Sequence, residues 1–575
     1  MMMRGVVTGM KEEGDTVELK VRQQVEKMDF LIIGGGIGGL QAAITGAEKG
    51  LKTLVVEKAD TRRSGCAVNG NDHFACYIPE CHGKNLDFSV REMSKTMDGG
   101  SWQDMEMLKT WMERSYEVVK QWESYGICMR PNGDWNFEGH TFPGQQSYHL
   151  KYEGGDIKAV LTRQAEKSGC RIMNRTMITE LLTDGHKRVI GAIGIKIDQD
   201  EPEMILFQAK SVLIATGLVS RMYPGVNPAF MFNTSCCPAS TGSGHAMAWR
   251  AGAKLVNLEI PAVHVGSKYF ERGGKGSWIG LISDIYGRSI GPYMSQPSRK
   301  KGDITADVWP DIFLEKSRDG TGPVFMNCTN TSDEDIVYML EHFGNDALDS
   351  MMDYIDQNKI DIQKELMEFS FYGMDFANKG IEIGTDAQTS VENLYATGFA
   401  AGNINGHSSS AAVFGMIAAE QAALKNDSIS FLPVEQHPLA EEKKAFYQKI
   451  LKRGETGAHW REANGTLQSI MKDYAGYEGR SDSMLMAGLN YIRQLQKAAG
   501  AQMGAENAHE LMRVLEVLDM IDFAEPVFLT CRNRKESRDL HHRADYPGEN
   551  EALKNMYQTI EKEGNQVRMD WRRRR

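Results

Sequence analysis

Three glycines at the end of a short apolar run have the spacing of a nucleotide-binding turn. Gly34, Gly36 and Gly39 form G-x-G-x-x-G within DFLIIGGGIGGLQAA, and Glu57 closes the next apolar run. The first glycine permits the tight turn, the second lets the backbone approach a pyrophosphate, and the third lets the helix pack on the strand. The phosphates bind where the helix begins, and Glu57 accepts hydrogen bonds from the ribose. The pattern predicts a bound dinucleotide, either FAD or NAD.

This chemistry requires a strand, a helix and a second strand in register, and residues 29–60 have that pattern. Residues 103–125 carry Met, Leu, Trp and Val at helical spacing, which predicts a helix with this stripe in the core. Residues 433–523 are predicted to be mainly helical. A chain of 575 residues is too long for one hydrophobic core, so we expect several domains.

Composition excludes several classes of protein. The net charge of -11 argues against nucleic acid as a general partner, and the C-terminal WRRRR is expected to be a solvated tail. No apolar run reaches the roughly 20 residues that span a bilayer, and the charged N-terminus lacks a secretory segment. We therefore expect a cytoplasmic protein with no transmembrane segment.

The nine cysteines are scattered and form no CxxC motif. This usage is typical of a reducing compartment and leaves no grouped thiolates for an iron–sulfur cluster. The adjacent Cys236 and Cys237 are either a redox pair or, as we favour, two ordinary thiols in a turn. No set of His, Cys, Asp or Glu has metal-ligand spacing, so no metal site is expected.

Six segments carry a resemblance to a known family. In chain order they are IIGGGIGGLQAA, EKADTRRSGCAVNGN, LIATG, STGSGHAMAWRAGAKLVNLE, GIEIGTDAQTSVENLYATG and RKESRDLHHRADYP. Together they resemble the fumarate reductase/succinate dehydrogenase flavoprotein family over roughly residues 28–550. The resemblance implies FAD as the nucleotide and a two-electron oxidoreductase. The substrate would lie at the flavin, between the FAD-binding and capping domains.

The implied fold is α/β: a Rossmann-like FAD-binding domain with an inserted α+β capping domain and a C-terminal helical domain. The expected parts are an N-terminal extension (1–27), the first part of the FAD-binding domain (28–245), the capping domain (246–370), the second part of the FAD-binding domain (371–430), and the helical domain with its tail (431–575). Arg538 and Arg543 are expected to brace the helical domain against the FAD-binding domain.

Two turns, one at residues 215–217 and one at Gly398, consist of small residues. They match family positions that lie against the cofactor, where the backbone must approach closely. A helix opening near Ser409 would direct its N-terminus at the flavin. Gly65 stands where related RSHT segments carry a histidine bonded to the flavin, so we expect non-covalent FAD. The residues assigned to FAD are Gly34, Gly36, Gly38, Gly39, Glu57, Lys58, Ser64, Gly65, Asn69, Gly70, Ala215, Thr216, Gly217, Gly398, Asn403, Ser409 and Ser410.

The substrate positions depart from the fumarate and succinate pattern. Ala306 occupies the place of the proton-delivering arginine, Asp375 occupies the place of a histidine, and INGHSSSA lacks an arginine. The charged side chains that would bind the two carboxylates of fumarate or succinate are therefore missing. We do not expect fumarate or succinate to be the substrate.

The pattern is more similar to the alpha subunit of adenylylsulfate reductase, on the segments RSGC, STGSGHAMAWRAGA and GNINGHSSSAAVFGMIAAEQ. That resemblance makes His407 a substrate-facing imidazole. Lys268, or Arg272 in its place, would stand where that family has an arginine, although lysine lacks the planar fork that grips an oxyanion. His264 is a further candidate. The alternatives are a loop histidine for His407, solvated charges for Lys268 and Arg272, and a core histidine for His264.

Two other functions stay open from the sequence. One is an ene-reductase acting on an unsaturated acid or ring other than fumarate, and the other is a flavin-binding protein without catalysis. The resemblance also implies an electron-transfer partner for an enzyme with a small-molecule substrate. We expect a ferredoxin-like iron–sulfur subunit or a diffusible electron donor.

Overall fold

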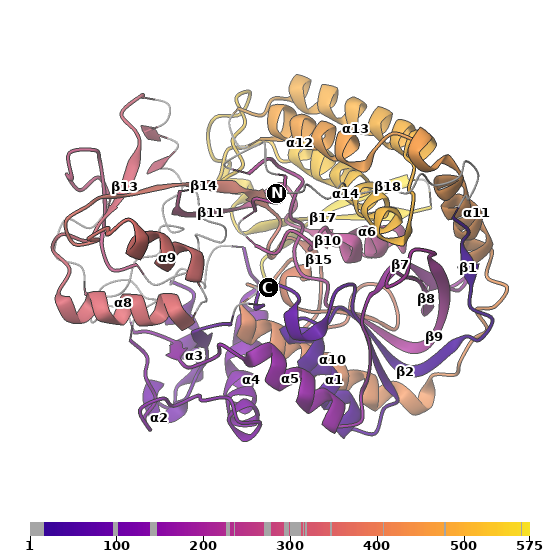
Figure 1. Cartoon of the computed structure of the whole chain (residues 1–575), viewed down its shortest axis with the longest axis horizontal. Coiled ribbons are helices and arrows are strands. Elements are labelled where there is room, and N and C mark those ends of the chain that lie inside the picture. Colours follow the sequence, from indigo (N-terminus) through magenta and orange to yellow (C-terminus); the bar gives the residue numbers. More distant parts are fainter. Residues whose placement is uncertain are drawn as a thin grey trace, which may run out of the picture.

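The computed structural model describes residues 17–575 apart from short gaps. The gaps are 69, 96–101, 139–145, 226–230, 235, 269–277, 292–297, 300–311, 314, 317–318, 346–347, 406, 477–478 and 565. The described chain forms three parts: a large sheet with helices beneath it, a smaller sheet beside α8 and α9, and a layer of long helices above (Figure 1).

The large sheet has β2 (Glu26–Ile33) near its centre, between β3 and β9. The strand order is β6-β3-β2-β9-β8-β7, and both β1 and β16 also pair with β9. Strands β2, β3, β6, β9 and β16 run parallel, and residues 30–33 and 53–56 are fully buried, as expected for parallel strands covered on both faces. The other strands are β1 (Lys20–Val21), β3 (Thr53–Val56), β6 (Arg171–Met173), β7 (Thr176–Thr183), β8 (Val189–Lys196), β9 (Glu203–Ile214) and β16 (Leu394–Ala396).

Helices α1 (Ile37–Glu48) and α10 (Ser408–Lys425) pack tightly against each other beneath this sheet (Figure 1). A Cβ added to Gly415 would lie 2.2 Å from the Gly38 carbonyl oxygen, and one added to Gly38 would lie 2.7 Å from the Ala411 carbonyl oxygen. Only glycine permits this approach, which brings the first turn of α10 beside the start of α1. The predicted helix over 103–125 is confirmed as α4 (Met105–Ser124), with its apolar stripe buried.

Smaller elements complete this part of the molecule. A two-stranded sheet of β4 (His73–Ala75) and β5 (His149–Lys151) lies apart from the large sheet in the hydrogen-bonding pattern. The remaining elements are α2 (Pro79–His82), α3 (Leu86–Met93), α5 (Ile157–Lys167), α6 (Ser243–Arg250), β10 (Leu255–Val256), β15 (Gly380–Ile381) and the 3-10 turns at 61–63, 398–400, 426–428, 454–456 and 551–553.

The smaller sheet belongs to the inserted segment. Its antiparallel order is β11 (Ala262–Ser267), β14 (Met367–Asp375), β13 (Val324–Asn327) and β12 (Leu281–Ser283). Helices α8 (Asp333–Asn345) and α9 (Asp349–Gln357) lie beside it (Figure 1). The fold is therefore the predicted α/β FAD-binding fold with a capping domain and a C-terminal helical domain.

The helical domain consists of α11 (Pro438–Arg453), α12 (Trp460–Ala475), α13 (Asp482–Gln502) and α14 (Ala508–Asn533). The Arg543 guanidinium donates to the carbonyl oxygens of Cys531 and Arg532, at 2.8 and 3.1 Å, where α14 ends. Arg538 pairs with Glu536 at 3.0 Å. These contacts lie within the C-terminal part of the chain and do not reach the FAD-binding domain, so the predicted bracing is not seen among them, and neither arginine lines the cavity described below.

The expectation of a solvated arginine tail is wrong. Strands β17 (Met556–Glu563) and β18 (Gln566–Arg573) form a hairpin, and β17 pairs with β10. The Arg572 guanidinium lies 2.7 Å from Asp104 and 2.5 Å from Glu382. The tail is therefore a strand, and its charge is neutralised by carboxylates of the FAD-binding domain.

Candidate active site

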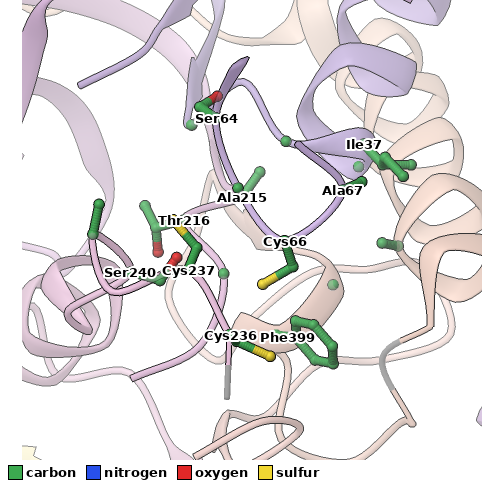
Figure 2. A pocket seen from close by; sticks show the side chains of 18 of the residues that line it. Ile37, Ser64, Cys66, Ala67, Ala215, Thr216, Cys236, Cys237, Ser240 and Phe399 are labelled. Atoms are coloured by element: carbon green, nitrogen blue, oxygen red, sulfur yellow. The ribbon is translucent and has the colours of Figure 1, made fainter. Parts of the chain in front are cut away.

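A cavity of about 740 Å³ opens where β2, β9 and β16 end, at the carboxyl edge of the large sheet. Open α/β sheets bind ligands at this edge. Figure 2 shows part of its wall, including Ser64, Ala215 and Thr216. The FAD residues predicted from the sequence that line it are Gly34, Gly36, Gly38, Glu57, Lys58, Ser64, Gly65, Ala215, Thr216, Gly217 and Gly398.

The glycine turn has the close contacts that the sequence motif predicts. Gly34 has φ +104°, and a Cβ there would lie 2.5 Å from the Ala215 carbonyl oxygen. A Cβ on Gly39 would lie 2.0 Å from the Gly34 carbonyl oxygen, so this glycine serves helix packing. A Cβ on Gly36 would meet only the Ala215 oxygen, at 3.8 Å. The space beside Gly36 thus belongs to the cavity, where a pyrophosphate would approach the backbone.

Glu57 and Lys58 follow β3 and have different environments. The Glu57 carboxylate accepts hydrogen bonds from the backbone N–H groups of Gly35 and Ala59, both at 2.7 Å. Lys58 donates to the Ala239 carbonyl oxygen at 2.7 Å and pairs with Glu516 at 2.5 Å. The ion pair links the cavity wall to α14 of the helical domain.

Three buried hydroxyl groups test whether FAD fits this cavity. The side-chain oxygens of Ser64, Thr216 and Thr241 line it and have no hydrogen-bond partner within the described part of the chain. Buried polar groups almost always have a partner, and leaving one unpaired costs about 1–3 kcal/mol. A dinucleotide supplies phosphate, ribose and ring oxygens that can pair with such groups. The residues present therefore fit FAD.

Four other residues assigned to FAD are placed outside the cavity wall. Asn403 donates to Asp104 at 3.0 Å and to the Ile383 carbonyl oxygen at 2.9 Å, so its amide holds the loop before α10. Ser409 accepts from the Trp111 indole, and Ser410 donates to the Asn405 carbonyl oxygen. Gly70 has φ +96° and serves the turn. Asn69 lies outside the described residues.

The three thiols at positions 66, 236 and 237 also line the cavity. Their side chains extend into the part shown in Figure 2. Burial raises the pKa of the Cys237 thiol, which keeps it protonated and weakly nucleophilic. This environment fits the expectation of an ordinary thiol, and no disulfide joins any of the described cysteines.

The catalytic candidates are not gathered at one place. His407 lines the cavity at the N-terminus of α10. Lys268 follows β11, and its ammonium pairs with Glu368 at 2.5 Å within the small sheet. His264 is opposite Tyr372 in the register of β11 and β14. Arg272 and Ala306 lie outside the described residues. Among the catalytic candidates whose side chains the structure describes, His407 is the one that lines the cavity wall.

Most of a side-chain cluster around His407 was not predicted from the sequence. The rings of His73, His149 and His407 have centroids 5.6, 5.9 and 6.1 Å apart, and we call these three residues the imidazole cluster. His73 and His407 line the cavity together with Asn71 and Ser408. The indole of Trp111 lies nearly parallel to the His407 ring, at 6.3 Å.

A two-stranded antiparallel sheet explains why these side chains meet. In the antiparallel register of β4 and β5, His73 is opposite Lys151 and Ala75 is opposite His149. Alternate residues of a strand share a face, so both histidines and Lys151 lie on one face while Phe74 and Leu150 enter the core. The alternation of polar and apolar residues in DHFA and YHLK could have predicted two short strands with histidines on one face. The sequence does not show that these two strands pair with each other, or in which register, because the fold sets both.

Buried charge surrounds the imidazole cluster. Asp72 is fully buried, with one carboxylate oxygen 2.5 Å from Nδ1 of His73 and the other 3.2 Å from the ammonium of Lys151. Nδ1 of His342, on α8 of the capping domain, lies 3.6 Å from the same carboxylate. Within the described part of the chain, no group of His, Cys, Asp or Glu has an arrangement that could hold a metal ion.

Two family models match the chain. The model described as FAD binding domain matches residues 29–414, and the model described as Fumarate reductase flavoprotein C-term matches residues 464–574. The fold and the cavity define a flavoprotein with an FAD-binding domain. The chain belongs to the fumarate reductase/succinate dehydrogenase flavoprotein family and is an FAD-dependent oxidoreductase.

The similar proteins include both fumarate reductases and an adenylylsulfate reductase. The chain is 26% identical to one subunit of the fumarate reductase (CoM/CoB) of Methanothermobacter marburgensis, covering 92% of this chain and 96% of that protein. Its structure is similar to adenylylsulfate reductase from Archaeoglobus fulgidus, with a TM-score of 0.82, 22% identity and 98% of each chain covered. The quinol fumarate reductase flavoprotein of E. coli gives a TM-score of 0.77 at 17% identity, covering 96% of this chain and 97% of that one.

Across the described residues, every helix is too short or too polar to span a bilayer.

Proposed function

We propose that this oxidoreductase transfers two electrons between FAD and a small anionic substrate held at the imidazole cluster. Sulfur chemistry of the adenylylsulfate-reductase type is the first candidate. The supporting observation is the convergence of three imidazoles at one end of the cofactor cavity, beside the first turn of α10. Imidazoles donate hydrogen bonds and carry positive charge when protonated, which suits a sulfo group or a carboxylate.

Helix α10 adds to this preference for anions. Its N-cap is His407, whose side chain forms no capping hydrogen bond, and Ser408 and Ala411 of its first turn line the cavity. The N-terminus of an 18-residue helix presents backbone N–H groups and a partial positive charge. Negative charge near His407 is therefore stabilised, whether it belongs to a substrate or to a reduced cofactor.

The protein's own residues have separable roles. The glycine turn, Glu57 and Lys58 would hold the dinucleotide, and Gly65 offers no side chain for a covalent bond to it, so we propose dissociable FAD. FAD supplies two-electron transfer when bound. His407 and His73 would bind and orient the substrate. Lys268 is excluded from our proposed substrate site because Glu368 neutralises it within the small sheet.

The electron-transfer partner is also a proposal. The family resemblance implies either a ferredoxin-like iron–sulfur subunit or a diffusible donor, and the fumarate reductase (CoM/CoB) relative named above is itself one subunit of an enzyme. The scattered cysteines of this chain are consistent with electrons arriving from outside.

Ene-reduction of an unsaturated acid is the second candidate. The observation in its favour is the 26% identity to a fumarate reductase subunit over nearly the whole chain. Against fumarate itself stand Asp375 and the segment INGHSSSA, which lack the expected histidine and arginine. An unsaturated acid with one carboxylate would need fewer charged side chains to bind it.

A visible spectrum of the purified protein separates the candidates. For sulfur chemistry, we expect bleaching of the flavin band by sulfite and AMP together and by neither alone. His407→Ala should lose this response while keeping its FAD, whereas the exposed control His186→Ala should keep both. If the spectrum does not change, photoreduced protein is mixed with unsaturated acids, and reoxidation supports ene-reduction. A protein without flavin absorbance would refute the whole proposal.

A further inference from the structure

We infer that His73, oriented by Asp72, is the acid–base group that exchanges a proton with the substrate. This inference rests on the proposed function, because it assumes that the substrate occupies the imidazole cluster. His73 is the member of the cluster that both lines the cavity and bonds directly to a buried carboxylate. His407 lies beside His73, and we assign it the role of binding the substrate.

The orientation of the ring follows from one short contact. Nδ1 of His73 lies 2.5 Å from Asp72, so this nitrogen carries a proton and donates a hydrogen bond to the carboxylate. Any exchange with a ligand in the cavity must then take place at Nε2, on the other side of the ring. A carboxylate that fixes the tautomer and stabilises the imidazolium is the arrangement that makes histidine an effective general acid and base.

Lys151 explains why Asp72 does not cancel the charge of a protonated His73. The ammonium of Lys151 is buried and lies 3.2 Å from the second oxygen of Asp72, so the negative charge already has one partner. With His73 protonated, the three groups carry a net charge of +1. A buried site with that net charge favours an anionic ligand, and donating the proton to the substrate removes the excess.

Groups from every neighbouring element face this site. Strand β5 contributes His149 and Lys151, the start of α10 contributes His407, and α8 contributes His342. The ring of Tyr338 packs against His342 at 4.1 Å. The capping domain thus reaches the carboxylate that orients His73, which places the proton exchange at the junction of the two domains.

In the reducing direction, an activated sulfate would take two electrons from the bound cofactor, its S–O bond would break to release sulfite, and the leaving phosphate oxygen would take one proton from His73. An unsaturated acid would take a hydride (two electrons and one proton) from the bound cofactor at one carbon of the double bond, and one proton from His73 at the other carbon. The Nε2–H bond breaks, the proton forms a new bond to the acceptor, and the neutral imidazole regains a proton from water. In the oxidising direction, neutral His73 takes the proton that the substrate releases. Asp72 stays ionised throughout.

Histidine NMR tests the pair without any substrate. FAD-loaded protein carrying 13Cε1-labelled histidine is titrated between pH 5 and 9, and His73→Gln identifies the resonance of His73. In Asp72→Asn, we expect the midpoint of this resonance to move to lower pH, because a neighbouring negative charge is lost. In His186→Gln, which alters an exposed turn, it should not move. A His73 resonance that is the same in wild type and Asp72→Asn would overturn the inference.

Kinetics then distinguish a proton-transfer role from a binding role. The rate measured is flavin reduction by sulfite with AMP, or reoxidation of photoreduced protein by an unsaturated acid. His73→Gln should lower the limiting rate by about a hundredfold or more, while the half-saturating concentration changes less than tenfold. Asp72→Asn should give a smaller loss and a displaced pH profile. A His73→Gln variant with only weaker binding would refute proton transfer, whereas a wild-type protein inert to all acceptors would refute the proposed function and leave the NMR result standing.

Discussion

Replacing Glu516 by Gln tests the buried ion cluster that connects the cofactor cavity to the helical domain. Glu516 is fully buried on α14, with Lys58 at 2.5 Å, Arg513 at 2.8 Å and Arg221 at 3.0 Å. Glutamine keeps the shape of the side chain and removes its charge. Three cations would then share one buried site without the carboxylate that compensates them.

The pKa of Glu516 sets the size of the effect. Burial alone would raise this pKa, but the charges of Lys58, Arg221 and Arg513 outweigh burial and lower it from 4.5 to about 2. Each pKa unit corresponds to about 1.4 kcal/mol, so the interaction favours the folded state by roughly 3 kcal/mol at neutral pH. Breaking buried ion pairs by removing one partner costs a similar amount, about 3–5 kcal/mol. We therefore expect the free energy of unfolding to fall by about 3–5 kcal/mol.

The pH dependence gives the sign of the effect. A carboxylate whose pKa is lowered on folding contributes stability above its unfolded pKa and loses it as the pH falls through the folded value. The difference in stability between wild type and Glu516→Gln should therefore be largest above about pH 5 and shrink steadily toward pH 2. Urea unfolding followed by tryptophan fluorescence at several pH values measures this difference.

A second carboxylate on the same helix provides the control. Glu525 pairs with Arg493 at 2.7 Å at the surface, where ion pairs contribute about 1 kcal/mol or less. Glu525→Gln should therefore lower stability far less than Glu516→Gln. Equal losses in the two variants, or a Glu516→Gln effect that does not change between pH 5 and pH 2, would refute the reasoning.

Three further outcomes follow from contacts described above. Gly39→Ala should abolish FAD binding, measured as flavin absorbance per protein, because its Cβ would lie 2.0 Å from the Gly34 carbonyl oxygen; full flavin content would contradict this. Arg572→Ala should lower stability by about 2 kcal/mol in denaturant unfolding, since it removes a buried charged hydrogen-bonded contact to Asp104; an unchanged unfolding curve would show that the tail is dispensable. Acid precipitation should release all the FAD into the supernatant, because Gly65 has no side chain to bond it; yellow colour in the pellet would indicate covalent attachment.

Local backbone requirements are what the sequence predicts best. The turn at Gly34 and the packing of Gly39 depend on residues only a few positions apart, and both have the expected geometry. The helix over 103–125 was equally predictable because its apolar spacing is local. The family resemblance adds the order of the domains, since it draws on segments spread over most of the chain.

Long-range pairing explains what the sequence could not show. Lys268 aligns with an arginine of a related family, but its partner Glu368 lies 100 residues further along and is opposite it only in the folded sheet. The C-terminal arginines read as a solvated tail because Asp104, which accepts from Arg572, is more than 460 residues away. In each case the sequence showed that the side chain is charged, but it did not show which carboxylate neutralises that charge in the folded protein.

In the proposed function, the imidazole cluster would allow substrate choice to change while the cofactor site stays the same. His73 and His149 come from two short strands far apart in the sequence, and His407 comes from the start of a helix that also packs on α1. The cofactor residues are fixed by backbone geometry that admits only glycine or small side chains. The cluster is formed by side chains, whose chemistry a point substitution changes directly. If the substrate binds as proposed, specificity would reside in the β4–β5 sheet and the first turn of α10, and testing exchanges at these positions is the direct route to the substrate.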